Sequence, residues 1–166
     1  SDKSWSITSL RYFNPIGSHP SGLIGDDPLS GKNSNLMPAI IKVVKGFKNY
    51  LDVFGDDYNT FDGTPIRDYI HIMDLSEAHV KALDFVDKNN GINIFNIGTG
   101  QGVSVLELIK TFEDISGFKV PIKLSKRREG DSAICYANPQ KANTLLKWSS
   151  KYNLNQMCES AWKYIC

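Results

Sequence analysis

The sequence predicts an α/β fold in which some of the strands pair in parallel. Strand-like and helix-like segments alternate along the 166 residues, and Gly-, Pro- and Asp-rich turns separate them. Hydrophobic residues make up 41% of the chain and charged residues 22%, enough for a core that needs no metal or disulfide support. We therefore expect one α/β unit.

Composition excludes several functional classes. Nineteen basic and eighteen acidic residues leave a formal charge of +1, which disfavours a nucleic-acid-binding or polybasic membrane surface. No apolar run approaches the ~18 residues that span a bilayer, and the start of the chain lacks the pattern of a signal peptide. Cys135, Cys158 and Cys166 form no Cys-x-x-Cys pair, as is typical of a reducing compartment. We expect a cytoplasmic protein.

In the first part of the chain, alternation with β-favouring residues predicts a strand over 6–12. Residues 13–34 are crowded with Gly, Pro, Ser, Asn and Asp and predict a long irregular loop, of the kind that is often functional. Helical spacing of apolar residues predicts a helix from about 35 to 47, with Pro38 in its first turn. A short strand follows over 50–55.

Two capping boxes are predicted in the middle of the chain. A strand over 67–72 is followed by Asp74 and Glu77, which we expect to cap a helix reciprocally. A further strand over 91–97 leads to the second box, Ser104 with Glu107, at the start of a helix that Gly117 should end.

The last third predicts shorter elements. A strand over 121–124 precedes a polar loop, and a second short strand leads into a helix with Asn138 as its cap and Pro139 in its first position. A final helix is expected from about 155 to 165.

The turn Gly98-Thr99-Gly100-Gln101-Gly102 follows a strand and precedes a helix, as a dinucleotide-binding turn does. Its third glycine comes one residue early for G-x-G-x-x-G, and no acidic residue closes a strand about twenty positions later. This spacing favours a tight turn over a phosphate site.

Two polar loops hold the strongest candidates for binding. Arg67, in DGTPIRDYIH, could grip a phosphate with two parallel donors, or could only solvate a strand end beside Asp68. Arg128 follows a basic run, with Asp131 placed to accept bonds from a sugar hydroxyl; the alternative is a solvated charge cluster. Residue types alone leave both alternatives open.

The residues show no self-contained catalytic device: no metal-ligand spacing, nucleophile elbow, Walker loop or Cys–His pair. His71 is a weak candidate, His79 lies on an apolar helix face where structural histidines are common, and His19 has no identifiable partner.

Several motifs, long and in order, carry a resemblance to a known family: RYFNPIGSHPSGLIGDDP, NSNLMP, VFGDDYNTFDGTPIRDYIHIMDLSEAH, FNIGTGQGVSVLELI and RREGD. Over essentially its whole length the chain resembles the C-terminal half of the UDP-glucose 4-epimerases (UDP-galactose 4-epimerases), a family of extended short-chain dehydrogenases/reductases. This implies the substrate-binding portion of that fold, including segments that complete its Rossmann-type sheet.

The resemblance also implies an activity. In this family bound NAD takes hydride from C4 of the UDP-hexose and returns it to the opposite face of the 4-keto sugar, interconverting UDP-glucose and UDP-galactose in galactose metabolism. Residues 1–166 would be the C-terminal UDP-sugar-binding part. The N-terminal NAD-binding domain and the catalytic Tyr and Lys of Y-x-x-x-K would lie upstream, so that the chain alone should be inactive. The complete enzyme is expected to be a homodimer.

The family's contact residues carry over by motif. The substrate-binding asparagine of F-N-P matches Asn14, and the residues beside the nicotinamide match Tyr12 and Phe13. The N-L-M-P contact to the nucleotide matches Asn35 and Leu36, and the strand that meets uracil matches Asp52, Val53 and Phe54. The two diphosphate arginines match Arg67 and Arg128, and the carboxylate on the uridine ribose matches Asp131.

Cys135 matches a position beside the sugar that is tyrosine in strict UDP-glucose enzymes and smaller in those that also accept N-acetylated sugars. The resemblance therefore predicts room for UDP-GlcNAc and UDP-GalNAc, although a buried cysteine acting as a small hydrophobe fits the same position. Two alternatives stay open: another UDP-sugar-modifying extended reductase, such as a decarboxylase or dehydratase, and a non-catalytic nucleotide-sugar-binding module.

Overall fold

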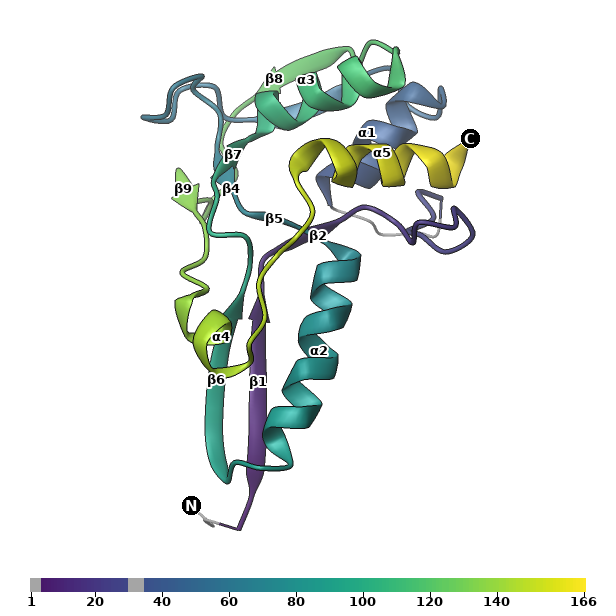
Figure 1. The fold of residues 1–166 in the computed structure, drawn as a ribbon. Helices are drawn as coiled ribbons and strands as arrows, with labels where there is room; N and C mark the ends of the chain where they lie inside the picture. The colour runs from purple at the N-terminus through teal and green to yellow at the C-terminus, as the bar shows by residue number, and fades with distance from the viewer. Residues whose placement is uncertain (1–3, 30–34) are drawn as a thin grey trace.

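A computed structural model describes residues 4–29 and 35–166, and it confirms the predicted α/β fold with parallel strands. Two long strands and the helices beside them form one region, and helices α1, α3 and α5 form a second region at the other end (Figure 1). Short strands connect the two regions. Among the described residues no helix is long and apolar enough to cross a membrane.

The first region is built on a pair of parallel strands, β1 (Ser6–Tyr12) and β6 (Gly91–Ile97), whose bounds match the prediction. Helix α2 (Ile72–Val86) packs beside β1 and helix α4 (Gln140–Leu145) beside β6 (Figure 1). The apolar side chains between these elements form one core: Ile70, Leu75, Ala78, Phe95, Ile97, Ala142, Leu146 and Trp148.

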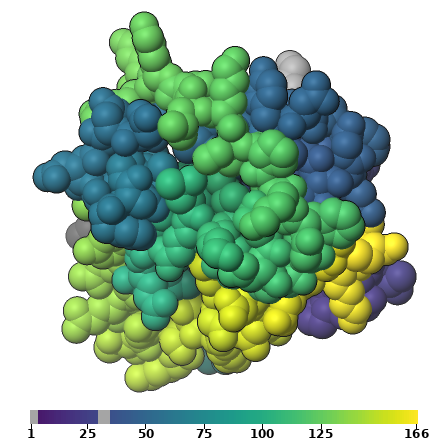
Figure 2. All heavy atoms as spheres, turned by 90° about the horizontal axis from the view of Figure 1, so that it is seen from above, coloured from purple at the N-terminus to yellow at the C-terminus, as the bar shows by residue number. Residues whose placement is uncertain are grey.

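The second region has its own core. Its helices are α1 (Leu36–Val44), α3 (Val105–Ser116) and α5 (Leu154–Ile165), and its parallel strands are β3 (Leu51–Phe54) and β8 (Ile122–Ser125). Figure 2 views this end of the molecule from above, with α3 in green beside α5 in yellow. Ile40, Val53, Leu108, Phe112 and Cys158 are among the most buried residues of this core.

Five very short strands connect the regions. β2 (Asn14–Ile16) pairs in parallel with β5 (Tyr69–His71), and β4 (Ile66–Arg67) lies between antiparallel β7 (Val103–Ser104) and parallel β9 (Ile134–Cys135). β2 corrects the prediction of an irregular loop over 13–34, of which residues 30–34 lie outside the described part. Its sequence, Asn-Pro-Ile, is too short for a periodic signal, so pairing with β5 decides its conformation.

The structure confirms some of the predicted helix ends and shifts others. Ser104 and Glu107 form the expected capping box, and Gly117 ends α3 with a φ of 75°. Asn138 accepts a bond from the backbone N–H of Gln140, but α4 begins one residue later than predicted, after Pro139.

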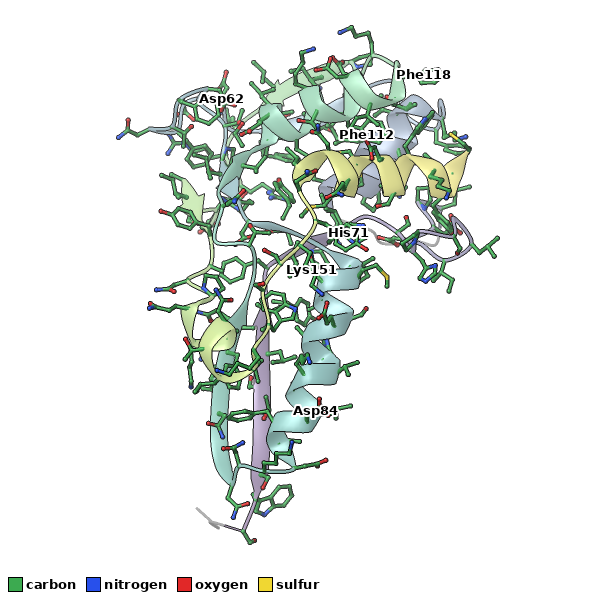
Figure 3. The ribbon with its side chains drawn as sticks, viewed as in Figure 1. Asp62, His71, Asp84, Phe112, Phe118 and Lys151 are labelled. Atoms are coloured by element: carbon green, nitrogen blue, oxygen red, sulfur yellow. The ribbon has the colours of Figure 1, made fainter. Side chains whose placement is uncertain are left out.

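The capping box predicted at Asp74 and Glu77 is wrong. Helix α2 begins earlier, and its N-cap is His71, whose Nδ1 accepts the N–H of Met73 at 3.0 Å. Asp74 instead accepts the backbone N–H groups of Lys151 and Tyr152 at 3.0 and 3.1 Å. His71 and Lys151 both lie near the start of α2 (Figure 3). This carboxylate therefore attaches the chain before α5 to the start of α2.

Candidate functional site

The site is organised around β4, the central strand of the three-stranded sheet. In this sheet Arg67 is paired in register with Cys135 of β9 on one side and Val103 of β7 on the other. The Arg67 side chain is only 17% exposed, and its Nη1 donates to the Ile66 carbonyl at 2.8 Å. The strand therefore holds this guanidinium in a fixed direction.

Arg128 and Asp131 join Arg67 from a loop. Arg128 Nε donates to Asp131 Oδ2 at 2.8 Å, and Arg67 Nη2 lies 3.8 Å from Asp131 Oδ1. The two arginines thus share one carboxylate, which leaves the arginine cluster (Arg67, Arg128 and Asp131) with a formal charge of +1. Two guanidinium groups arranged in this way can grip a phosphate or diphosphate with paired donors.

Strand β3 brings an aromatic ring to the same cluster. The Arg128 guanidinium carbon lies 5.0 Å from the centre of the Phe54 ring, within the range of a cation–π contact. The neighbouring Val53 side chain is only 1% exposed and belongs to the core, so its side chain cannot meet a ligand. Asp52 is partly exposed and accepts a weak bond from Ser125 at 3.4 Å.

Asn14, Tyr12 and Phe13 lie where β1 passes into β2. Asn14 is exposed, and its backbone N–H donates to the carbonyl of Asp68 at 2.9 Å, one residue beyond Arg67. Tyr12 ends β1 with a side chain that is 55% exposed, and the Phe13 N–H donates to Ile97. The carboxyl end of a parallel strand is where ligands bind in such sheets.

Asn35 and Leu36 lie apart from the arginine cluster in the described contacts. Asn35 is the N-cap residue of α1, with a side chain that caps nothing, and Leu36 packs partly against the second core. Asn35 lines a cavity of about 430 Å³ whose other walls include Gly17, Met73 and Tyr164, and no residue of the arginine cluster lines it.

The turn from Gly98 to Gly102 is the tight turn that its spacing predicts, and Asp68 explains why. The Asp68 carboxylate is fully buried and accepts the N–H of Thr99 and of Gly100, each at 2.9 Å. A Cβ on Gly98 would approach Asp68 Oδ2 to 2.6 Å, so glycine is required there. The donors that could hold a phosphate are thus already bound to a carboxylate.

The histidines have structural roles. His71 accepts the Met73 N–H through Nδ1, so its Nε2 carries the proton and donates to Ser160 Oγ at 2.9 Å. Burial lowers the pKa of His71 below its ordinary value and so keeps the ring neutral, although the charge of Asp74 opposes this. His79 donates from Nδ1 to the Leu75 carbonyl at 2.8 Å, and His19 contacts Ser21 within its loop.

Sequence reasoning missed the role of Asp68, which it treated only as a neighbour of Arg67. An aspartate between Arg67 and Tyr69, where one short strand ends and the next begins, gives no signal of burial by itself. The available hint was the glycine turn, whose unpaired N–H groups need an acceptor that an aspartate can supply.

Comparisons with known proteins agree with this fold. A family model described as GDP-mannose 4,6 dehydratase matches residues 3–161. Curated relatives include the UDP-glucose 4-epimerase of Bacillus subtilis, 51% identical over 98% of this chain and 48% of its own length, and that of Homo sapiens, 48% identical over 98% and 47%. The chain thus spans about half the length of the curated relatives it matches.

Solved structures extend the likeness to the backbone. The UDP-glucose 4-epimerase of Bifidobacterium longum, in complex with NAD+ and UDP, matches with a TM-score of 0.93 at 45% identity, over 98% of this chain and 48% of that chain. The enzyme of Stenotrophomonas maltophila, with bound NAD and formylated UDP-arabinopyranose, gives a TM-score of 0.92 at 47% identity, over 97% and 48%. The chain therefore belongs to the GDP-mannose 4,6 dehydratase family and has the fold of the extended short-chain dehydrogenases/reductases.

Proposed function

We propose that this chain is the UDP-sugar-binding part of an NAD-dependent UDP-glucose 4-epimerase, which interconverts UDP-glucose and UDP-galactose. The relatives at about 50% identity carry that name. In this proposal the NAD-binding domain and the catalytic Tyr and Lys lie outside these 166 residues, so this chain binds the substrate and another part of the protein performs the hydride and proton transfers.

The observation that carries the proposal is the pair of arginines at one carboxylate. A diphosphate brings two phosphoryl groups, and Arg67 and Arg128 approach a common point from a strand and from a loop. When a diphosphate takes over the guanidinium donors, Asp131 is released to accept bonds from a ribose hydroxyl. Phe54, at the end of β3, then lies on the nucleoside side of the diphosphate.

In this proposal Asn14 contacts the sugar and Tyr12 contacts the nicotinamide. NAD supplies the acceptor and donor of hydride when it is bound. The exposed Tyr12 ring, at the carboxyl end of β1, is placed to contact the nicotinamide, and Asn14 follows it closely enough to hold the sugar. Because Asp68 occupies the Gly98–Gly102 turn, the pyrophosphate of NAD must be held elsewhere.

Cys135 extends the proposal to substrate size. It is exposed and lies opposite Arg67 in the sheet, and it leaves more space than a tyrosine would, so UDP-GlcNAc and UDP-GalNAc should also be accepted. In the complete protein Cys135→Tyr should remove turnover of the N-acetylated sugars and retain that of UDP-galactose. Cys135→Ser, which keeps a small side chain, should retain both. Equal loss of both substrates in the tyrosine variant would count against a size gate.

Cytoplasmic location and a homodimeric complete enzyme belong to the same proposal. The three free thiols support a reducing compartment. Cell fractionation and sedimentation of the complete protein test these two parts.

The experiment that tests the function is a turnover assay of the complete protein with NAD and UDP-galactose, with the products identified by NMR. Formation of UDP-glucose, with KM raised by Arg67→Ala, supports the proposal. A decarboxylated or dehydrated product would replace it with another reductase activity. Binding of UDP without any turnover would leave a nucleotide-sugar-binding module.

A further inference from the structure

Asp68 makes more contacts with neighbouring segments than its place in the sequence suggests. It is 0% exposed, and its carboxylate accepts four bonds: from Thr99 N–H at 2.9 Å, Thr99 Oγ1 at 2.7 Å, Gly100 N–H at 2.9 Å and Ala137 N–H at 3.1 Å. Its own carbonyl accepts the N–H of Asn14 at 2.9 Å. One residue thus joins three segments that are distant in sequence.

Two of these segments lead to strands that pair with the strand of Arg67. Thr99 and Gly100 precede β7, which pairs with one side of β4, and Ala137 follows β9, which pairs with the other side. Strands of two residues are too short to be stable by themselves. The Asp68 carboxylate is therefore the common attachment that keeps β7 and β9 against the strand that carries Arg67.

We infer that Asp68 is a positioning residue, which fixes Arg67, Cys135 and Asn14 relative to one another so that they can face one UDP-sugar. The inference rests on the proposed function for the identity of the ligand. Asp68 itself is buried and does not touch the ligand. Its effect on binding is transmitted through the three-stranded sheet and through β2.

An amide at this position would break two specific bonds. In Asp68→Asn, Oδ1 can still accept both bonds from Thr99, whereas Nδ2 replaces the oxygen that accepts from Gly100 and Ala137. The N–H groups of Gly100 and of the buried Ala137 would then face an N–H₂ group. Both β7 and β9 should move away from β4 without a change in side-chain volume.

The chain offers a matched control in Asp74. This carboxylate is 1% exposed and also accepts two backbone N–H groups, those of Lys151 and Tyr152, but it joins α2 to the chain before α5 rather than the strands at the arginine cluster. Both of these bonds end on Oδ2, so an asparagine could keep them through its amide oxygen, whereas Asp74→Ala removes the acceptor and should lower thermal stability as Asp68→Asn does. It should leave KM unchanged.

The test is steady-state kinetics of the complete protein with UDP-galactose, together with melting temperatures, for the wild type, Asp68→Asn and Asp74→Ala. We expect KM to rise about tenfold in Asp68→Asn, with kcat within about twofold of the wild type. The weakened contacts hold the substrate equally well in the ground state and in the transition state, so their loss affects binding and not the chemical step. In Asp74→Ala only the melting temperature should fall. Unchanged KM in both variants would overturn the positioning role.

Thr99→Val keeps the test decisive if Asp68→Asn does not fold. It removes one donor to Asp68 and retains the side-chain shape, and we expect KM to rise about threefold. An unchanged KM in this variant would then overturn the inference. Failure of the proposed function is distinguishable, because in that case the wild type itself neither binds nor converts UDP-galactose, and the positioning role falls with it.

Discussion

The two sides of the arginine cluster differ in how they are held. Arg67 lies on a strand between two others, is 17% exposed and donates to a backbone carbonyl. Arg128 lies in a loop with a side chain that is 55% exposed, and it contacts Asp131 and the face of Phe54. The same charge is thus presented once by a pre-organised group and once by an adjustable group. Pre-organised donors lose less entropy on binding, so the strand side should provide most of the affinity.

The largest expected effect is that of Arg67→Ala. Loss of two charge-assisted hydrogen bonds to a diphosphate should weaken UDP binding about 100-fold, and it also leaves Asp131 with one cation fewer. Isothermal titration of UDP into the complete protein measures this. Lys110→Ala, which removes an exposed cation of α3, is the control and should have no effect. A change below about threefold for Arg67→Ala would contradict the assignment of a diphosphate to this cluster.

Lysine substitutions sharpen the comparison. Arg67→Lys retains the charge but loses the planar fork on the rigid strand, so we expect UDP binding to weaken about tenfold. Arg128→Lys should weaken it only about threefold, because a flexible ammonium group in the loop can still reach a phosphate. Equal effects of the two substitutions on the dissociation constant would show that strand and loop hold their cations with the same stiffness.

The sequence predicts those parts of the fold that depend on residues close together in the chain. Local chemistry identified β1, β6, the capping box at Ser104 and the helix end at Gly117, because each depends on residues within a few positions. It failed at β2 and at Asp74, whose conformations depend on partners dozens of residues away. Tertiary pairing decides both, and no pattern within a single segment carries that information.

The same limit applies to the candidate site. Arg67, Arg128 and Asp131 were identified as residues of separate loops, and the resemblance assigned the arginines to the diphosphate and Asp131 to the ribose, but only the fold brings Arg67 within ion-pair distance of Asp131. Asp68 could not be singled out at all. Its role arises from three segments that meet only in the folded chain.

Cysteine labelling tests the strand side without any substitution. Cys135 lies opposite Arg67 and is exposed, so saturating UDP should slow its alkylation several-fold, as measured by peptide mass spectrometry of the complete protein. Cys166, exposed at the end of α5, should react equally with and without UDP. Cys158 should stay unlabelled, because burial raises the pKa of its thiol to about 12 and keeps it protonated at pH 8. Equal protection of Cys135 and Cys166 would indicate a global effect of UDP and not a local one.

The smallest expected effect concerns the loop side. Phe54→Leu retains an apolar side chain at the end of β3 but removes the aromatic face beneath Arg128, a contact that contributes about 0.5–1 kcal/mol at a partly exposed position. UDP binding should weaken only about two- to fivefold, with thermal stability nearly unchanged. Phe47→Leu, which alters an exposed ring after α1, is the control. Phe54→Leu could instead weaken UDP binding as much as Arg67→Ala does. The loop side would then provide most of the affinity for UDP, because the position of the Arg128 guanidinium would depend strongly on the aromatic ring that it contacts.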